Sequence, residues 1–195
     1  GHHITGFRAR IVSTPIHVPF TISRESLPKA DIVMIEITTS SGVLGLGECA
    51  PFPSLTYDDV TTAHEVAQQL LQQMIGLDVE AALDHLSTAL PDLRQRSITA
   101  SVGVECALWD LRAQAQHKPL AALFGPIPIQ SLDTDITMPI MAAEAIPNFW
   151  RLYKPYGFTT IKVKVAGDLR ADVAMLKTLA GIVPPSTRFI LDGNQ

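Results

Sequence analysis

An alternation of strand and helix patterns in the last third of the chain constrains the fold most strongly. Short segments rich in β-branched and apolar residues alternate there with amphipathic segments of helical length. The predicted strands are residues 134–139, 159–165 and 188–192, and the predicted helices are residues 142–156 and 169–180. A strand–helix–strand order of this kind is typical of parallel strands joined by right-handed crossovers. We therefore predict a parallel sheet covered by helices.

The first 125 residues show strands followed by helices, a different pattern. Strands are predicted over residues 4–14, 31–39 and 43–49, and helices over about 57–76, 79–90 and 99–116, with a loop over 20–29. Pro91 is expected to end the second helix, because proline lacks the N–H that a helix interior needs. This order predicts an α+β domain built on an antiparallel meander. The break Gly125-Pro126-Ile127-Pro128 separates a domain at 1–125 from one at 126–195.

Composition excludes several classes of function. A chain of 195 residues that is 47% hydrophobic can build a globular core. With a net charge of −4 it has no overall basic character, so we expect no nucleic-acid partner. No apolar run approaches the length of about 18 residues that a membrane helix needs, so no membrane partner is expected. Two cysteines, Cys49 and Cys106, do not form a disulfide framework and fit a reducing, cytoplasmic location.

Two lysines lie close together near the end of the second parallel strand. Lys162 and Lys164 are two residues apart, so on a strand they share one face at a spacing of about 6–7 Å. A neighbouring cation and desolvation both lower the pKa of a lysine, which lets it act as a base near neutral pH. Taken alone, the pair fits a solvated edge strand better.

A carboxylate and an amide end the third parallel strand. Asp192 and Asn194 also share a face, and their oxygens suit Mg²⁺. Taken alone, Asp-Gly-Asn is more typical of an Asx turn. However, both polar pairs follow consecutive parallel strands at their carboxyl ends, which form the catalytic face of (β/α) barrels. Their combination favours an active site.

The same residues carry a resemblance to a known family. The K-x-K and D-x-N motifs at the ends of the second and third strands resemble the muconate-lactonizing subgroup of the enolase superfamily. The segments 47–51 (GECAP) and 107–111 (ALWDL) resemble its capping domain. The segments 54–56 (SLT) and 133–137 (DTDIT) resemble its dipeptide epimerases. One departure is the linker sequence Leu-Phe-Gly-Pro at 123–126, where many relatives carry a double glycine. The resemblance implies an α+β capping domain followed by the first strands of a (β/α) TIM-like barrel.

The resemblance also implies a chemistry for these residues. Lys164 would be an acid/base at the substrate α-carbon, and Lys162 would neutralise the substrate carboxylate. Asp192 would be the first of three carboxylate ligands of Mg²⁺, and Asn194 would support the metal site or face the substrate. Arg24 and Thr137 would contact the substrate, Arg24 from a loop that in this family covers the active site. The implied activity is an isomerase that abstracts the proton α to a carboxylate through an enediolate, acting on a dipeptide of the L-Ala-D/L-Glu type.

Several alternatives stay open at this point. The same half-reaction serves muconate cycloisomerase and o-succinylbenzoate synthase/N-acylamino acid racemase, and a catalytically dead binding domain would keep the fold. The expected partner is a small-molecule carboxylate or dipeptide, and a homo-oligomer is left open. The last five residues, Leu191 to Gln195, have the pattern of a strand entering a loop, so we expect the chain to be part of a longer enzyme and inactive by itself.

Overall fold

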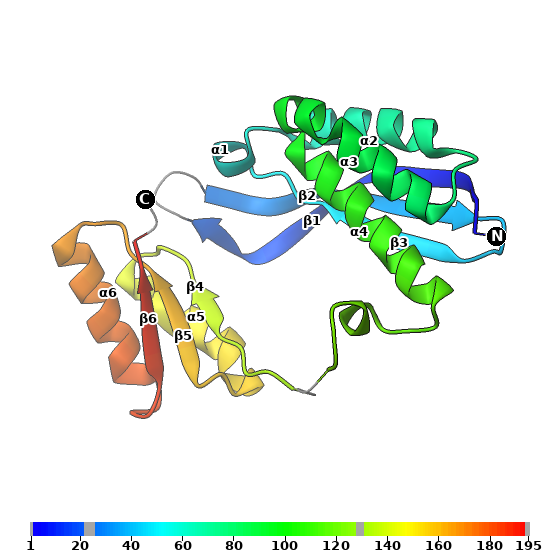
Figure 1. The fold of residues 1–195 in the computed structure, drawn as a ribbon. Helices are drawn as coiled ribbons and strands as arrows, with labels where there is room; N and C mark the ends of the chain where they lie inside the picture. Colours follow the sequence, from blue (N-terminus) through cyan, green and yellow to red (C-terminus); the bar gives the residue numbers. More distant parts are fainter. Residues whose placement is uncertain (1, 22–25, 128–130, 194–195) are drawn as a thin grey trace. The chain divides into compact units, whose positions relative to one another are not determined.

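The computed structural model describes residues 2–21, 26–127 and 131–193 (Figure 1). Contacts divide the chain into two compact units. One contains residues 1–14 and 30–128, and the other contains residues 15–29 and 129–195. Residues 15–21 and 26–29 thus group with the C-terminal part of the chain. The division at residue 125 predicted from the sequence remains a proposal.

A three-stranded sheet forms one layer of the first unit, although residues 15–21 and 26–29 of its first two strands are grouped with the second unit. Its strands are β1 (Ile4–Thr21), β2 (Ser26–Thr39) and β3 (Leu44–Cys49), in the order β1-β2-β3. Strands β2 and β3 are antiparallel, with Val33 opposite Cys49 and Thr38 opposite Leu44. The loop predicted over 20–29 is wrong at both ends, because β1 continues through Thr21 and β2 begins at Ser26. The meander itself is confirmed.

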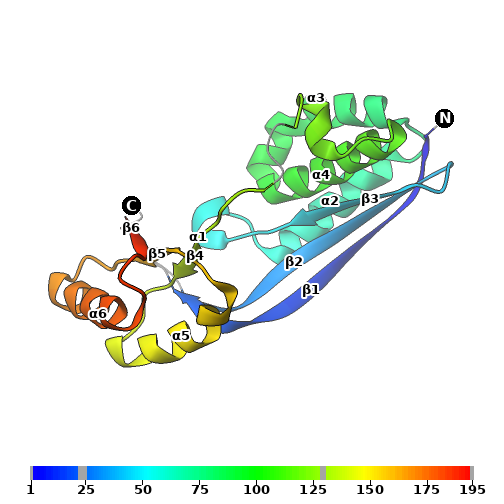
Figure 2. The same cartoon turned by 90° about the horizontal axis from the view of Figure 1, so that it is seen from below.

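Helices cover one face of this sheet (Figure 2). They are α1 (Pro53–Thr56), α2 (Val60–Met74), α3 (Val79–Arg96) and α4 (Ile98–Ala115), followed by the 3₁₀ turn η1 (Leu120–Leu123). Side chains of Asp59, Asp78 and Ser97 cap α2, α3 and α4, each accepting a hydrogen bond from a first-turn amide.

The predicted stop at Pro91 is wrong, since α3 runs on to Arg96. Pro91 itself is exposed, whereas Leu93 beyond it is 3% exposed and belongs to the core. Burial of Leu93 therefore offsets the hydrogen bond that the proline removes.

Helix α4 lies unusually close to β3. A Cβ atom at Gly103 would lie 2.9 Å from the backbone N of Cys49 and still closer to its Sγ. Asp110, further along α4, accepts a hydrogen bond of 2.8 Å from the backbone N of Leu46. A Cβ at Gly47 would lie 2.9 Å from the backbone N of Ala107, so the two capping-domain segments recognised in the sequence, 47–51 and 107–111, pack closely against each other.

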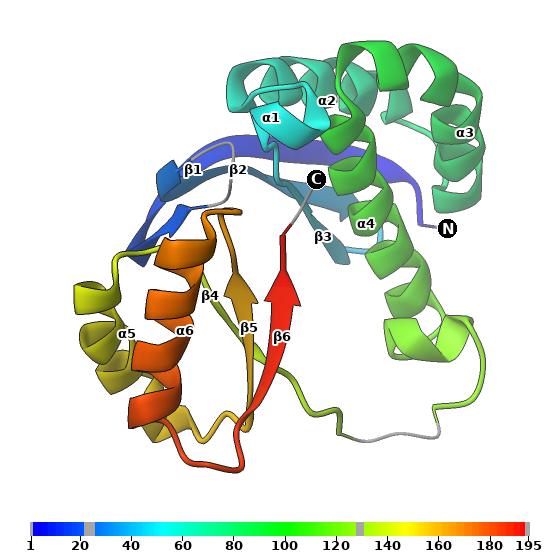
Figure 3. The ribbon, with the colours of Figure 1, turned by 90° about the vertical axis from the view of Figure 1, so that its left-hand side faces the viewer.

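The second unit contains a parallel sheet with two helices. Strands β4 (Ile136–Met138), β5 (Thr160–Lys164) and β6 (Arg188–Asp192) pair in that order, and both pairings are parallel, as predicted. Helices α5 (Ile146–Tyr153) and α6 (Leu169–Ile182) lie on one face of the sheet (Figure 3). The helix predicted over 142–156 is shorter than expected and is flanked by the 3₁₀ turns η2 (Ala143–Ala145) and η3 (Lys154–Tyr156). Pro147 occupies the first turn of α5 and Pro155 lies in η3, where neither needs a helical N–H partner.

Hydrophobic side chains of this unit gather between the sheet and its helices. Ile161 and Val163 of β5 are completely buried, with Phe149 of α5 and Leu179 of α6 in the same cluster. The opposite face of β5 is therefore left for its polar residues. Within the described ranges, no helix combines the length and hydropathy needed to cross a membrane.

Candidate active site

The candidate site lies on the face of the parallel sheet that the helices do not cover. Lys162 and Lys164 alternate along β5 with the buried Ile161 and Val163. In the register of the sheet, Lys164 pairs with Asp192 of β6, and Lys162 pairs with Thr137 of β4. Paired residues of neighbouring strands share a face. The four polar residues therefore point to the same side.

Both lysines bind one carboxylate. The Nζ of Lys164 lies 2.6 Å from Oδ2 of Asp192, and the Nζ of Lys162 lies 2.9 Å from the same oxygen. The side chain of Lys164 is only 10% exposed, against 35% for Lys162 and 23% for Asp192. An ammonium group as buried as that of Lys164 needs a paired anion, and Asp192 supplies it. The structure thus brings together three residues that the sequence singled out.

Electrostatics favours the charged form of Lys162. The hydrogen bond to Asp192 and the negative charge of that carboxylate raise the pKa of Lys162 above its ordinary value. The charge of Asp135 adds to the effect, and partial desolvation of the ammonium opposes it. Lys162 therefore remains a cation across the neutral range, which suits a group that neutralises a substrate carboxylate.

A carboxylate that sequence reasoning missed holds the loop after Lys164. Oδ1 of Asp172 accepts a hydrogen bond of 3.0 Å from the backbone N of Ala166, and Oδ2 accepts one of 2.9 Å from that of Gly167. Gly167 has a φ of +86°, a conformation that favours glycine. The sequence feature that could have indicated this contact was the Gly167-Asp168 pair before the helix, followed by a second acid, Asp172, in its first turn.

The donor chemistry of the site suits Mg²⁺ but is incomplete within the described ranges. Asp192 offers a partly exposed carboxylate at the carboxyl end of a strand, the type of ligand that Mg²⁺ prefers. No group of three or more His, Cys, Asp or Glu side chains that could hold a metal occurs among the residues the structure describes.

Two predicted site residues, Arg24 and Asn194, lie outside the described residues, so their roles remain predictions. Thr137 is half-buried and next to Lys162 in register, and its role as a substrate contact also remains a prediction.

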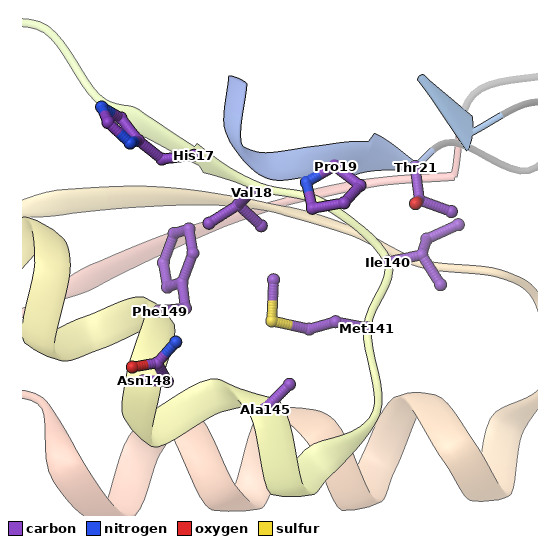
Figure 4. Close-up of a pocket in the computed structure, with 9 residues that line it drawn as sticks. All are labelled: His17, Val18, Pro19, Thr21, Ile140, Met141, Ala145, Asn148 and Phe149. Carbon is purple, nitrogen blue, oxygen red and sulfur yellow. The ribbon is translucent and has the colours of Figure 1, made fainter. Parts of the chain in front are cut away.

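A pocket of about 280 Å³ lies in the same unit, between the end of β1 and the segment that follows β4 (Figure 4). Its lining is mostly apolar, and the side chain of Met141 points into it. None of the predicted site residues lines it.

Comparisons with known proteins give relatives over nearly the whole chain. An L-Ala-D/L-amino acid epimerase of Populus trichocarpa is 35% identical over 189 residues, which are 95% of this chain and 44% of that protein. A substrate-liganded L-Ala-D/L-Glu epimerase of Bacillus subtilis superimposes with a TM-score of 0.87 at 27% identity, covering 99% of this chain and 54% of its own. A dipeptide epimerase of Cytophaga hutchinsonii, complexed with Mg and dipeptide D-Ala-L-Val, superimposes with a TM-score of 0.86 at 29% identity. The match covers 99% of this chain and 52% of that protein.

The chain thus spans about half the length of the relatives that it matches. These similarities confirm the resemblance to dipeptide epimerases that the sequence motifs indicated, and with it the capping-domain fold. The profile of the mandelate racemase/muconate lactonizing enzyme N-terminal domain matches residues 4–125. Because that match covers more than half of the sequence, the chain belongs to the mandelate racemase/muconate lactonizing enzyme family.

Proposed function

We propose that the protein containing this chain is a Mg²⁺-dependent epimerase that removes and returns the proton α to a carboxylate. The observation that carries the proposal is the cluster of Lys162, Lys164 and Asp192 at the carboxyl ends of neighbouring parallel strands. A buried lysine, a second cation and a metal-binding carboxylate are the groups that such a proton transfer needs.

Each residue of the cluster has its own part in the proton transfer. Lys164, once its ammonium group has released a proton, accepts the α-proton at Nζ, while the electron pair of the C–H bond moves into the substrate carboxylate to form an enediolate. Lys162, as the ammonium ion, stabilises the charge that develops there. Asp192 would hold Mg²⁺, which when bound acts as a Lewis acid toward the substrate carboxylate. Inversion requires a second acid/base on the opposite face of the α-carbon, and we propose that later strands of the barrel supply it.

We propose a dipeptide as the substrate, most closely one of the L-Ala-D/L-Glu type. The support comes from the relatives, which include an L-Ala-D/L-Glu epimerase and a dipeptide epimerase complexed with D-Ala-L-Val. Thr137, Arg24 and Asn194 are proposed to contact the dipeptide. We further propose a cytoplasmic location, since Cys49 and Cys106 are both free thiols.

Deuterium exchange tests the proposal. The full-length protein should incorporate deuterium at the α-carbon of L-Ala-L-Glu in D₂O, and only with Mg²⁺ present. Lys164→Ala should abolish the exchange of one epimer, and Lys162→Ala should lower exchange by about 10²-fold or more through loss of charge stabilisation. Lys177→Ala, on the exposed side of α6, is the matched control and should leave exchange unchanged. Near-normal exchange in Lys164→Ala would place the base elsewhere.

A further inference from the structure

We infer that Asp172 is a positioning residue for Lys164, an inference that rests on the proposed function. The side chain of Asp172 bonds to the backbone beyond Lys164 rather than to the ammonium group. Its two carboxylate oxygens accept hydrogen bonds from two consecutive amides, those of Ala166 and Gly167, at 3.0 and 2.9 Å. These amides follow Lys164 by two and three residues. Both oxygens of one side chain are thus engaged by the turn that leaves the catalytic strand.

The turn is held from two directions. On the side of β6, the backbone N of Val165 donates a hydrogen bond of 3.1 Å to the backbone O of Asp192, which extends the ladder beyond Lys164. On the side of α6, Asp172 provides the second attachment. The positive φ of Gly167 lets the chain turn toward α6, so that both amides face the carboxylate. The backbone that carries Lys164 is therefore fixed between a strand and a helix.

Asp172 is itself fixed in place. Its backbone N donates a hydrogen bond of 2.8 Å to the O of Asp168, and the side chain of Asp168 caps α6 by accepting from the amides of Arg170 and Ala171. A negative charge in the first turn of a helix is also favourable, because unpaired amides give that end a partial positive charge. The two hydrogen bonds from the amides of Ala166 and Gly167 to Asp172, the Asp172 clamp, thus join a well-anchored helix end to the end of β5.

The consequence concerns proton transfer more than folding. The two amides are on an exposed turn, where water can replace the lost hydrogen bonds, so removing the clamp should cost little global stability. Lys164, however, must reach the α-carbon within hydrogen-bonding distance, and a displacement of about 1 Å can cost about 100-fold in rate. We therefore expect Asp172→Ala to lower kcat for exchange by about 10- to 100-fold, with KM changed by less than about 3-fold.

The experiment measures α-deuterium exchange of each dipeptide epimer separately, in the full-length protein with Mg²⁺. Lys164→Ala first identifies which epimer presents its proton to Lys164. Asp172→Ala should slow exchange of that epimer only, because the base on the opposite face is untouched. Lys177→Ala, on the exposed side of the same helix, is the matched control and should leave exchange of both epimers unchanged.

The outcomes separate the two levels of the proposal. Equal slowing of both epimers, or wild-type exchange of both, would overturn the positioning role of Asp172. Absence of exchange in the wild-type protein, or an unchanged Lys164→Ala, would instead overturn the proposed function. If Asp172→Ala does not fold, Asp172→Asn takes its place, because asparagine keeps the shape and one acceptor oxygen. It should slow exchange of the same single epimer, by a smaller factor, and equal slowing of both epimers or wild-type exchange would again overturn the positioning role.

Discussion

The close approach of α4 to β3 predicts opposite effects for two glycine-to-alanine substitutions. Gly103 and Gly181 both lie within helices, where alanine is favoured over glycine by about 0.5–1 kcal/mol. A Cβ at Gly181 meets nothing within 4 Å, so Gly181→Ala should stabilise the protein by that amount. A Cβ at Gly103 would overlap Sγ of Cys49 and lie 2.9 Å from backbone atoms of Glu48 and Cys49.

The overlap at Gly103 cannot be relieved by rotating a side chain, because part of it involves the backbone of β3. Overpacking of this kind costs about 1–3 kcal/mol, more than the helix propensity gains. We therefore expect Gly103→Ala to destabilise by about 1–2 kcal/mol or more. For a unit of little more than 100 residues, each kcal/mol shifts the midpoint of thermal unfolding by about 4 °C.

Thermal unfolding and thiol labelling together test this reasoning. Cys49 is completely buried, and burial first, then the charges of Asp58, Cys106 and Glu48, raises the pKa of its thiol to about 12. The wild-type thiol should therefore resist alkylation, whereas in Gly103→Ala it should react faster as the helix separates from the strand. A Cys106→Ser background removes the exposed thiol. A Gly103→Ala variant as stable as Gly181→Ala, with Cys49 still protected, would refute the steric argument.

Two further substitutions and one truncation test the buried polar contacts of Asp58, the proposed metal site and the length of chain that activity requires. Asp58 accepts hydrogen bonds of 2.6 Å from the hydroxyls of Ser97 and Thr99, so Asp58→Ala should lower the free energy of unfolding by about 2–4 kcal/mol, as measured by denaturant titration. Burial alone would raise the pKa of Asp58, but these hydrogen bonds and one from Thr56 outweigh it and lower the pKa. The stability that Asp58 contributes is therefore complete above the unfolded-state pKa of about 3.9, and it is lost as pH falls through the lower pKa of the folded state. A stability that did not fall in acid, or that fell equally in Asp58→Ala, would contradict this. Asp192→Asn should weaken Mg²⁺ binding by about 10-fold or more in calorimetry of the full-length protein, because it removes the ligand charge, and unchanged affinity would remove Asp192 from the metal site. Residues 1–195 expressed alone should not epimerise L-Ala-L-Glu with Mg²⁺, since they supply one of the expected metal ligands, and turnover near that of a full-length relative would show this reasoning to be wrong.

The sequence alone determined the type and order of most elements. The change from three strands followed by helices to alternating strands and helices predicted both sheets, because strand and helix periods differ and each apolar pattern must bury one face. The spacing of Lys162 and Lys164 by itself placed both on one face, since side chains alternate along a strand. Motifs at two strand ends were sufficient to indicate the family, because the carboxyl ends of parallel strands meet at one edge.

Local rules failed where burial outweighed them. Pro91 should have ended α3, but Leu93 beyond it has a place in the core, and its burial keeps the helix intact. The strands of the first hairpin also extend to Thr21 and from Ser26, where a polar stretch with a proline suggested a loop; residues 26–30 are mostly exposed, so strand pairing rather than burial extends them. Propensity is a weak preference of a fraction of a kcal/mol per residue, which packing readily overrides.

Only the tertiary structure decided which side chains meet. Lys164 binds Asp192 because β5 and β6 pair in one register, and a slip of one residue would turn Asp192 to the helix side. The bonds of Asp58 to Ser97 and Thr99 join residues 39 and 41 positions apart, a distance over which no local pattern carries information. The carboxylate of Asp172 is close in sequence to the amides that it holds, but a side chain and a turn can meet only after helix and strand have packed. The sequence could therefore propose Lys164 as a base, but not its support by Asp172.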